Sequence, residues 1–127
     1  MALILDTNAL SAFADGDAAL RKAISSEQDL AVPAVVLGEY LFGVRRSRFR
    51  SRYEFWLDSY LTLFAVLPVG LRTAESYAEI RGELRTAGRP IPTNDLWIAA
   101  LTREHQSSLL SRDAHFDAVR GLSRISW

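Results

Sequence analysis

Cysteine is absent from this 127-residue sequence, and lysine is nearly absent. Without thiols the chain cannot form disulfides, thiolate zinc sites, iron–sulfur clusters or a cysteine nucleophile. Of the 15 basic residues, only Lys22 is a lysine and the rest are arginines. Arginine holds phosphates and carboxylates through a planar fork of N–H groups that lysine does not have. The lack of cysteine is typical of proteins in a reducing cytoplasm, and we expect a cytoplasmic location.

An excess of charge and long apolar runs are also missing. The 15 basic and 15 acidic residues balance to a net charge of zero, which argues against a protein that coats nucleic acid by bulk positive charge. The apolar segment 1–5 has no basic flank and ends at Asp6, so we expect neither a signal peptide nor a membrane partner. The length fits one domain over residues 1–127, and 49% hydrophobic residues are enough to form a core.

Short apolar runs alternate along the chain with segments of helical periodicity. The apolar runs predict strands at residues 3–5, 30–32, 63–66, 109–110 and 122–125. Helices are predicted at 8–14 and 17–25, from Pro33 to about Val44, at 49–61 and 73–87, and after a cap at Thr93. This alternation predicts an α/β fold with a largely parallel sheet.

Four acidic residues fall near the place where parallel sheets bind ligands, outside the carboxyl ends of the strands. Asp6 and Asp113 follow predicted strands, Asp95 lies in the first turn of a helix, and Glu39 lies about two turns into another. Helix capping explains Asp6 and Asp113 equally well, and the helix dipole by itself favours Asp95. Acids that do converge repel one another unless cations bind or some acids stay protonated.

Glu39 differs from the other three acids because its helical neighbours are apolar. The residues three and four positions away are Val35, Val36, Phe42 and Gly43. We therefore expect Glu39 on an apolar stripe, where a carboxylate needs a partner, a metal or a proton. Oxygen ligands of this kind favour Mg²⁺ or Mn²⁺. The two histidines, His105 and His115, are isolated in the sequence and are expected to be surface or packing residues.

With these acids identified, the chain resembles the PIN-domain ribonucleases, and within them the VapC-type toxins of bacterial toxin–antitoxin pairs. The resemblance rests on four segments that span nearly the whole chain: LILDTN at 3–8, VLGEY at 36–40, IPTNDLWIAA at 91–100 and SRDAHF at 111–116. It implies a three-layer α/β/α sandwich around a short, mainly parallel sheet. It also implies that the catalytic residues and metal ligands are Asp6, Glu39, Asp95 and Asp113.

The resemblance implies an activity and partners as well. The expected activity is Mg²⁺-dependent endoribonuclease hydrolysis of RNA phosphodiester bonds, with Mn²⁺ able to substitute, which inhibits translation and growth. The expected partners are an RNA substrate, a second copy in a homodimer and a cognate VapB-type antitoxin that neutralises the toxin. Asp117, one helical turn after Asp113, is a second-rank acid of the site. Thr7 and Ser111 offer hydroxyls to orient a metal-bound water or a phosphate, and Asn8 and Asn94 are expected to fix the neighbouring acids by hydrogen bonds. Capping or turn chemistry is an equal explanation for these last four residues.

A run of arginines without an intervening acid lies between two predicted helices. Its members are Arg45, Arg46, Arg48, Arg50 and Arg52. They are suited to contact the RNA backbone, to dock an acidic antitoxin tail, or to solvate the surface, and the sequence leaves all three open. The aromatic residues of the following helix, Tyr53, Trp56 and Tyr60, either line an antitoxin groove or pack in the core.

Two other protein families that place aspartates at the ends of their strands fit this sequence less well. A haloacid-dehalogenase-type phosphatase needs a second aspartate two residues after Asp6, where this chain has Asn8. A receiver domain needs a lysine late in the chain, and the one lysine is Lys22. A non-catalytic PIN-like module that binds RNA or a protein remains an alternative to the enzyme.

Overall fold

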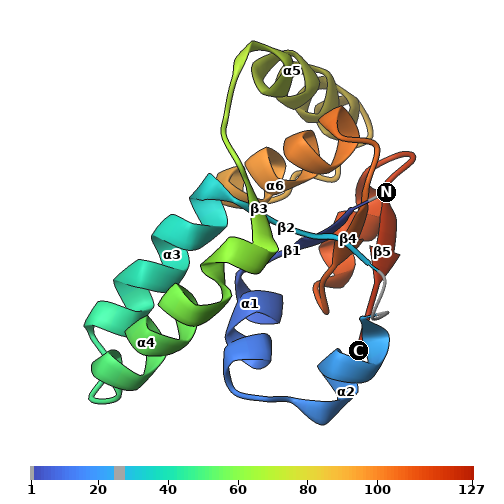
Figure 1. Ribbon diagram of the computed structural model, residues 1–127. Coiled ribbons are helices and arrows are strands. Elements are labelled where there is room, and N and C mark those ends of the chain that lie inside the picture. The colour runs from blue at the N-terminus through green and yellow to red at the C-terminus, as the bar shows by residue number, and fades with distance from the viewer. Residues whose placement is uncertain (1, 25–27) are drawn as a thin grey trace.

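The central sheet contains five strands, all parallel, in the order β3-β2-β1-β4-β5 (Figure 1). The computed structural model describes residues 2–24 and 28–127. The strands are β1 (Leu3–Leu5), β2 (Leu30–Pro33), β3 (Phe64–Leu67), β4 (Ser108–Leu110) and β5 (Ser123–Ile125). The prediction of a mainly parallel sheet is confirmed, and no predicted strand boundary is wrong by more than one residue.

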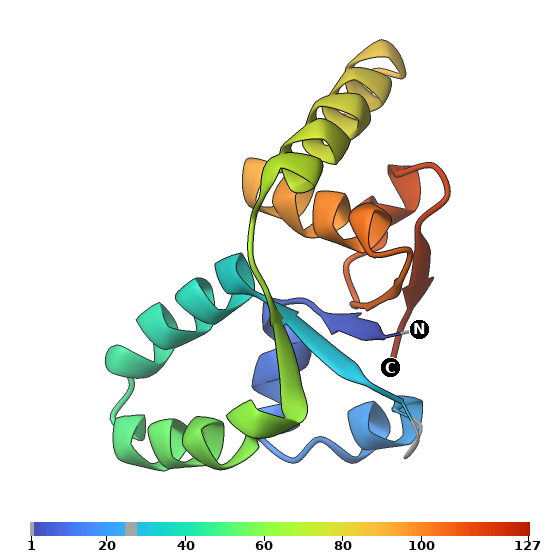
Figure 2. The ribbon, with the colours of Figure 1, turned by 45° about the horizontal axis from the view of Figure 1, so that its top comes forward.

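Helices cover both faces of this sheet. They are α1 (Thr7–Ala14), α2 (Ala18–Ala23), α3 (Ala34–Arg45), α4 (Arg50–Tyr60), α5 (Leu71–Thr86) and α6 (Thr93–Glu104), with 3₁₀ turns η1 (Leu61–Leu63) and η2 (Ala114–Ala118). Figure 2 shows α1 to α4 on one side of the sheet and α5 and α6 on the other, which confirms the three-layer sandwich. No helix in the described ranges is both long and apolar enough to cross a membrane.

Strand β1 lies at the centre of the sheet and is buried on both faces. Leu3 and Leu5 pack in one core cluster with Leu20 of α2, whereas Ile4 packs in the other with Ile98 of α6. All three strand residues have no exposed surface. Side chains of a strand alternate between its faces, so a short apolar run between two helix layers must be buried throughout.

The order of the strands creates a switch point between β1 and β4. Right-handed connections lead from β1 through β2 to the β3 edge, and the chain then crosses to β4 on the other side of β1. The connections after β1 and β4 therefore leave on opposite faces of the sheet. A crevice opens outside the carboxyl ends of two such strands, and it is the usual ligand site of this architecture.

Each predicted helix start differs from the observed start by one or two residues, and proline is the reason at α3 and α6. Pro33 ends β2 and precedes α3 instead of opening it, with φ −59° and ψ 143°. Pro92 takes the cap position of α6, so Thr93 is its first residue and not its cap. The proline ring fixes φ but leaves an extended ψ open. Helix α2 ends at Ala23, before the predicted end at residue 25, which lies outside the described residues.

The aromatic side chains of α4 are divided between core and surface. Trp56 stacks on Tyr60 with ring centroids 4.9 Å apart, and both meet Phe13 of α1 edge-on at 5.6 Å. Phe49, just before the helix, and Phe55 are exposed by 47% and 74%. The structure therefore assigns Trp56 and Tyr60 to core packing rather than to a groove for a partner.

Helix α5 ends in a turn that requires glycine. Gly88 has a φ of +66°, its N–H donates to the carbonyl of Arg85, and the N–H of Arg89 donates to that of Leu84. This pair of hydrogen bonds is the Schellman arrangement, which places the residue after the cap in the left-handed region. The predicted helix end at this glycine is confirmed.

Two substitutions of glycine by alanine in and after α5 are expected to have opposite effects. Gly88→Ala places a Cβ at positive φ and should lower the free energy of unfolding by about 1 kcal/mol. Gly82→Ala, inside the exposed helix with open space around its Cβ, should raise it by roughly 0.5–1 kcal/mol. Urea unfolding of both variants measures the difference, and a destabilised Gly82→Ala would contradict this account of the helix.

Candidate active site

Asp6 is held rigidly at the carboxyl end of β1. It caps α1, with Oδ1 accepting a hydrogen bond of 2.8 Å from the N–H of Ala9, and only 5% of the residue is exposed. Its backbone N–H donates to the carbonyl of Leu110 at the end of β4. Asp6 is therefore a helix cap, one of its two predicted explanations, and it also lies at the switch point.

Ser111 fastens the loop after β4 to the same place. It is fully buried, its Oγ accepts a hydrogen bond of 3.0 Å from the N–H of Asp113, and its side chain lies close enough to the carboxylate of Asp6 to lower the pKa of that acid. One serine thus fixes both acids that follow the two central strands. The structure supports a positioning role for this hydroxyl instead of a free hydroxyl that faces a ligand.

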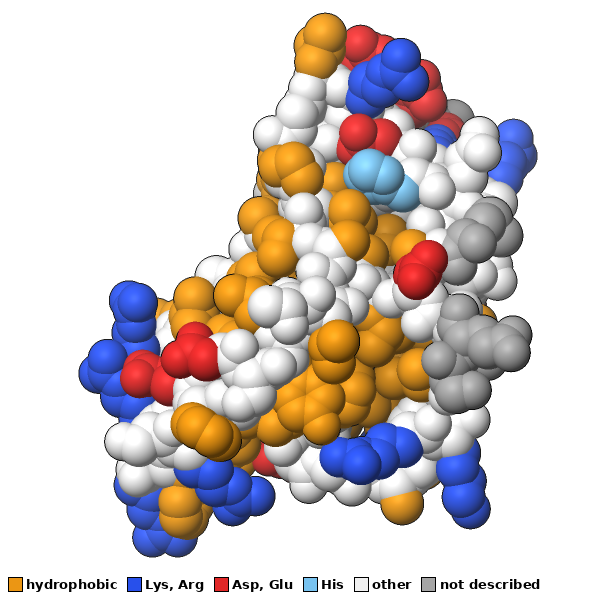
Figure 3. All heavy atoms as spheres, viewed as in Figure 1, with side chains coloured by type: hydrophobic (Ala, Val, Ile, Leu, Met, Phe, Trp, Pro, Cys, Tyr) orange, Lys and Arg blue, Asp and Glu red, His pale blue; other side chains and the backbone are white. Residues whose placement is uncertain are grey.

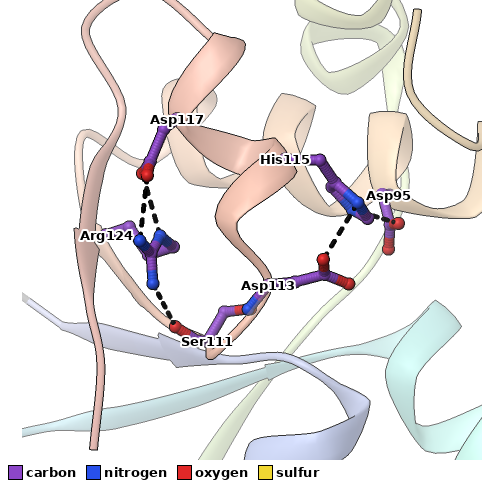
Figure 4. Close-up of polar contacts among 6 residues, drawn as sticks. All are labelled: Asp95, Ser111, Asp113, His115, Asp117 and Arg124. Carbon is purple, nitrogen blue, oxygen red and sulfur yellow. Dashed lines mark hydrogen bonds and ion pairs between the residues drawn. The ribbon is translucent and has the colours of Figure 1, made fainter.

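His115 joins Asp95 of α6 to Asp113 (Figure 4). Its Nε2 lies 2.7 Å from Oδ2 of Asp95, and its Nδ1 lies 2.9 Å from Oδ1 of Asp113. The first is a close ion-pair contact without hydrogen-bond alignment, since the buried Nε2 has no hydrogen-bond partner among the described residues. Ligand atoms of Asp95, Asp113 and His115 all lie within 4.8 Å of one another, a spacing at which they could share one metal ion.

The prediction that His115 is an isolated surface or packing residue is therefore wrong. The error arises because η2 turns His115 back toward Asp113 and across to α6, a contact that the sequence does not show. The one available signal was the spacing of two residues from Asp113. Phe116 is the packing residue of this segment, with no exposed surface.

Burial and mutual repulsion make the negative charge of this site costly. Loss of hydration raises the pKa of Asp6, and the charges of Asp95 and Asp113 raise it further, against hydrogen bonds from Ser111 and Ala9 that lower it. Burial also raises the pKa of Asp95, and Asp113 adds to this effect, whereas the contact with His115 lowers it. Three carboxylates from three parts of the chain therefore act on one another, and a bound cation would relieve their repulsion.

Glu39 does not occupy the apolar stripe that was predicted for it. Helix α3 buries Val36, Tyr40 and Val44, at intervals of four residues, and Glu39 lies on a neighbouring, exposed face. Phe42 shares that exposure, at 59%. Apolar neighbours in a helix indicate burial only if another element covers them. Glu39 instead lines a surface groove with Thr7 and Asp15, apart from the Asp95–Asp113–His115 cluster.

Asp117 lies away from the cluster, bound to an arginine. Both of its carboxylate oxygens accept hydrogen bonds from Arg124 of β5, at 2.8 and 2.9 Å, and Arg124 also donates to the carbonyl of Ser111 (Figure 4). This ion pair holds the pKa of Asp117 below its usual range. The geometry favours a structural role for Asp117, in which Arg124 ties η2 and the loop after β4 to the edge strand.

Three further candidates lie near the acids without contacting them. Thr7 is the half-buried first residue of α1 and faces the groove that Glu39 lines. Asn8 and Asn94 are exposed, and neither side chain makes a hydrogen bond with another described residue. The expected hydrogen bonds from these asparagines to the acids are therefore absent from the described part of the chain.

The PIN-domain family model matches residues 3–122 of this chain. The chain therefore belongs to the PIN-domain family. It is similar to Ribonuclease VapC1 of Rickettsia felis, with 31% identity over 130 residues that cover 99% of this chain and 96% of the relative. This similarity along nearly the full length places it among the VapC-type ribonucleases, as the sequence predicted.

Two solved structures share the fold. VapBC2 from Rickettsia felis, bound to a DNA fragment from its promoter, superposes with a TM-score of 0.89 at 23% identity and covers 100% of this chain and 99% of its own. VapBC-5 from Mycobacterium tuberculosis, a member of the VapBC family of toxin–antitoxin systems, gives a TM-score of 0.76 at 28% identity and covers 99% and 98%. The fold extends over the whole length of both.

Substitutions of Asp6 distinguish the contribution of its helix cap to stability from the contribution of its negative charge. Because the pKa of Asp6 is raised in the folded state, its contribution to stability is greatest below the unfolded value of about 3.9 and is lost as the pH rises through the folded value. Asp6→Asn keeps the cap without the charge, so in EDTA at pH 7 it should be at least as stable as the parent. Asp6→Ala also loses the cap, which costs about 1 kcal/mol.

Urea unfolding at a series of pH values tests this expectation. The advantage of Asp6→Asn over the parent should shrink toward pH 4, while the difference between the asparagine and alanine variants should stay constant. A parent protein that is clearly more stable than Asp6→Asn at pH 7 would show that the charge of Asp6 is satisfied within the protein itself.

Proposed function

We propose that this chain is a metal-dependent endoribonuclease of the VapC type that hydrolyses phosphodiester bonds in RNA. The observation that carries the proposal is the approach of Asp95, Asp113 and His115 to within 4.8 Å of one another beside the switch point between β1 and β4, where the charges of Asp95 and Asp113 also raise the pKa of Asp6. A phosphodiester is an anion, so a cluster of bare carboxylates would repel it. The substrate and the site become compatible only if a cation lies between them.

The donor set fits a hard divalent cation. The ligands would be carboxylate oxygens of Asp6, Asp95 and Asp113, and Glu39, whose exposed side chain is free to turn, would complete the set. Oxygen donors of this kind suit Mg²⁺, and Mn²⁺ also accepts an imidazole such as His115. When bound, the metal would neutralise charge on the phosphate and lower the pKa of an attacking water.

The other residues of the site keep the acids in place. Ser111 joins Asp6 to the backbone of Asp113, and Arg124 holds the carbonyl of Ser111. His115 contacts two of the acids, and when protonated on both nitrogens it would offset part of their charge. These contacts limit the movement of the carboxylates, which favours catalysis because groups already in position need no reorganisation during the reaction.

The expected partners are a cognate VapB-type antitoxin and a second copy of the chain. Similarity to the VapBC assemblies supports the antitoxin, which would restrain RNA cleavage and so relieve inhibition of translation and growth. Exposed apolar side chains at and beside the edge strand β3 support a homodimer that covers them. These residues are Leu63, Val66, Val69 and Leu71.

Asp95→Asn tests the assignment with little change in shape. The variant should fold as the parent does but cleave single-stranded RNA at least about a hundredfold more slowly, because a group that supports charge at the reacting centre is lost. EDTA should abolish cleavage by the parent, and added Mg²⁺ or Mn²⁺ should restore it. The matched control is Asp29→Asn, an exposed residue just before β2 and thus at the opposite end of the sheet.

The same experiment distinguishes the enzyme from a binding module. If the parent binds RNA but cleaves none in Mg²⁺ or Mn²⁺, the chain is a non-catalytic PIN-like module. If Asp95→Asn, purified by the same route, cleaves at the parent rate, the nuclease site lies elsewhere or the activity is a contaminant.

A further inference from the structure

Five arginines surround the turn between α3 and α4, and we call this segment, residues 45–52, the arginine tip. Arg45 ends α3, Arg46 and Arg48 lie in the turn, and Arg50 and Arg52 lie in the first turn of α4. Positive charge in a first turn opposes the helix dipole, and no acid there compensates for it. Helix stability therefore does not explain Arg50 and Arg52, whereas the positive charge of Arg45 favours the end of α3.

The guanidinium groups of the arginine tip are held against aromatic rings. Arg46 lies 5.2 Å from the ring centre of Phe42, and Arg48 lies 4.9 Å from that of Phe49. Arg52 lies 5.8 Å from the ring of Tyr53. Figure 3, which has the same viewpoint as Figure 1, shows basic and hydrophobic side chains interleaved at the end where α3 meets α4.

Most of these arginines have no acidic partner. Of these five arginines, only Arg50 forms an ion pair with a described residue, Glu54, at 2.6 Å. The N–H groups of Arg46, Arg48 and Arg52 therefore remain available to a ligand, while their flat faces are already oriented by the rings. Proteins that bind single-stranded RNA combine these two features, basic groups for the phosphates and flat groups on which bases stack.

A groove runs from Glu39 to the arginine tip. Its cavity, of about 280 Å³, is lined at one end by Thr7 and Glu39, next to Asp6 in the chain, and at the other by Ser47 and Tyr53 of the tip region. Tyr40 also lines it. This residue is only 5% exposed, yet its hydroxyl has no hydrogen-bond partner among the described residues. A buried hydroxyl without a partner is costly, and a ligand in the groove would satisfy it.

Resting on the nuclease function proposed above, we propose that the groove and the arginine tip together bind the single-stranded RNA that continues from the cleaved bond. Arg46, which caps α3, lies seven positions after Glu39, which is about 10 Å along the helix axis. At the roughly 3.4 Å spacing of stacked bases, the arginines meet the strand about three nucleotides from Glu39.

The chemistry of the groove favours RNA over an acidic protein tail. Asp15 and Glu39 face the groove, and Tyr53 donates a hydrogen bond of 2.8 Å to Asp15. Carboxylates in this position repel phosphates and acidic side chains alike, but they also accept hydrogen bonds from the amino groups of bases, which acidic side chains cannot donate. The hydroxyls of Ser47 and Tyr40 suit the ribose 2′-hydroxyl, which both donates and accepts.

The test compares two variants, each of which loses three positive charges, in different parts of the surface. The tip variant Arg46→Gln/Arg48→Gln/Arg52→Gln is compared with a matched variant, Arg21→Gln/Arg72→Gln/Arg85→Gln, which neutralises three exposed arginines elsewhere. Both are made in the Asp95→Asn protein, and binding of a labelled, unstructured single-stranded RNA is followed by fluorescence anisotropy at several salt concentrations.

The tip variant should bind RNA about tenfold more weakly or worse, and its plot of log affinity against log salt should be shallower by about 2, because each lost phosphate contact removes about 0.7. The matched variant should keep the slope of the parent. Equal slopes for the two variants would overturn the proposal. It would also be overturned if the tip variant kept its RNA affinity but lost affinity for an oligoglutamate peptide, which would identify the tip as a site for an acidic protein.

Tyr40→Phe tests the groove separately. Loss of an unpartnered hydroxyl should leave the stability unchanged or higher, while RNA affinity falls about threefold or more. Unchanged RNA affinity would remove the groove from the binding path. Because binding is measured without cleavage, the two proposals fail separately. A parent protein that binds RNA through the tip but never cleaves it disproves the nuclease function. A parent protein that cleaves RNA while the tip variant binds it normally disproves the proposed RNA-binding path.

Discussion

Repulsion among carboxylates at the switch point is the constraint on which this site depends. Asp6, Asp95 and Asp113 come from three distant parts of the chain, and burial raises the pKa of the first two. The surrounding structure must hold groups that would otherwise separate. It does so with a helix cap, a buried serine and a histidine between two acids. A cation is the remaining component that would make the cluster favourable.

The position of Asp6 shows how one residue serves both folding and chemistry. As the cap of α1 it stabilises the first helix, and as the residue after β1 it lies at the switch point of the sheet. Capping and metal binding are thus compatible, since a carboxylate has two oxygens and the cap uses one. Ser111 also has two roles, because it orders the loop after β4 and orients an acid at the same time.

Prediction succeeded where local chemistry decides the structure and failed where packing between elements decides it. The strands and helix ends follow from apolar runs, prolines and Gly88, all of which act within a few residues. Glu39 was misplaced because its apolar neighbours show only what could be buried, whereas α3 uses its Val36–Tyr40–Val44 face. His115 was missed because its contact with Asp95 crosses from η2 to α6. The ion pair of Asp117 could not be predicted because its partner Arg124 lies in β5, outside η2.

The sequence by itself determined the α/β class, the order of the elements, the PIN-type motifs and the presence of acids after β1 and β4. These follow from periodicity and from residues adjacent in the chain. Only the tertiary structure decided which acids meet, that a histidine lies between two of them, and that a groove runs from Glu39 to the arginine tip. The physical reason is that charge repulsion, burial and metal binding depend on distances in space, and strand order sets those distances.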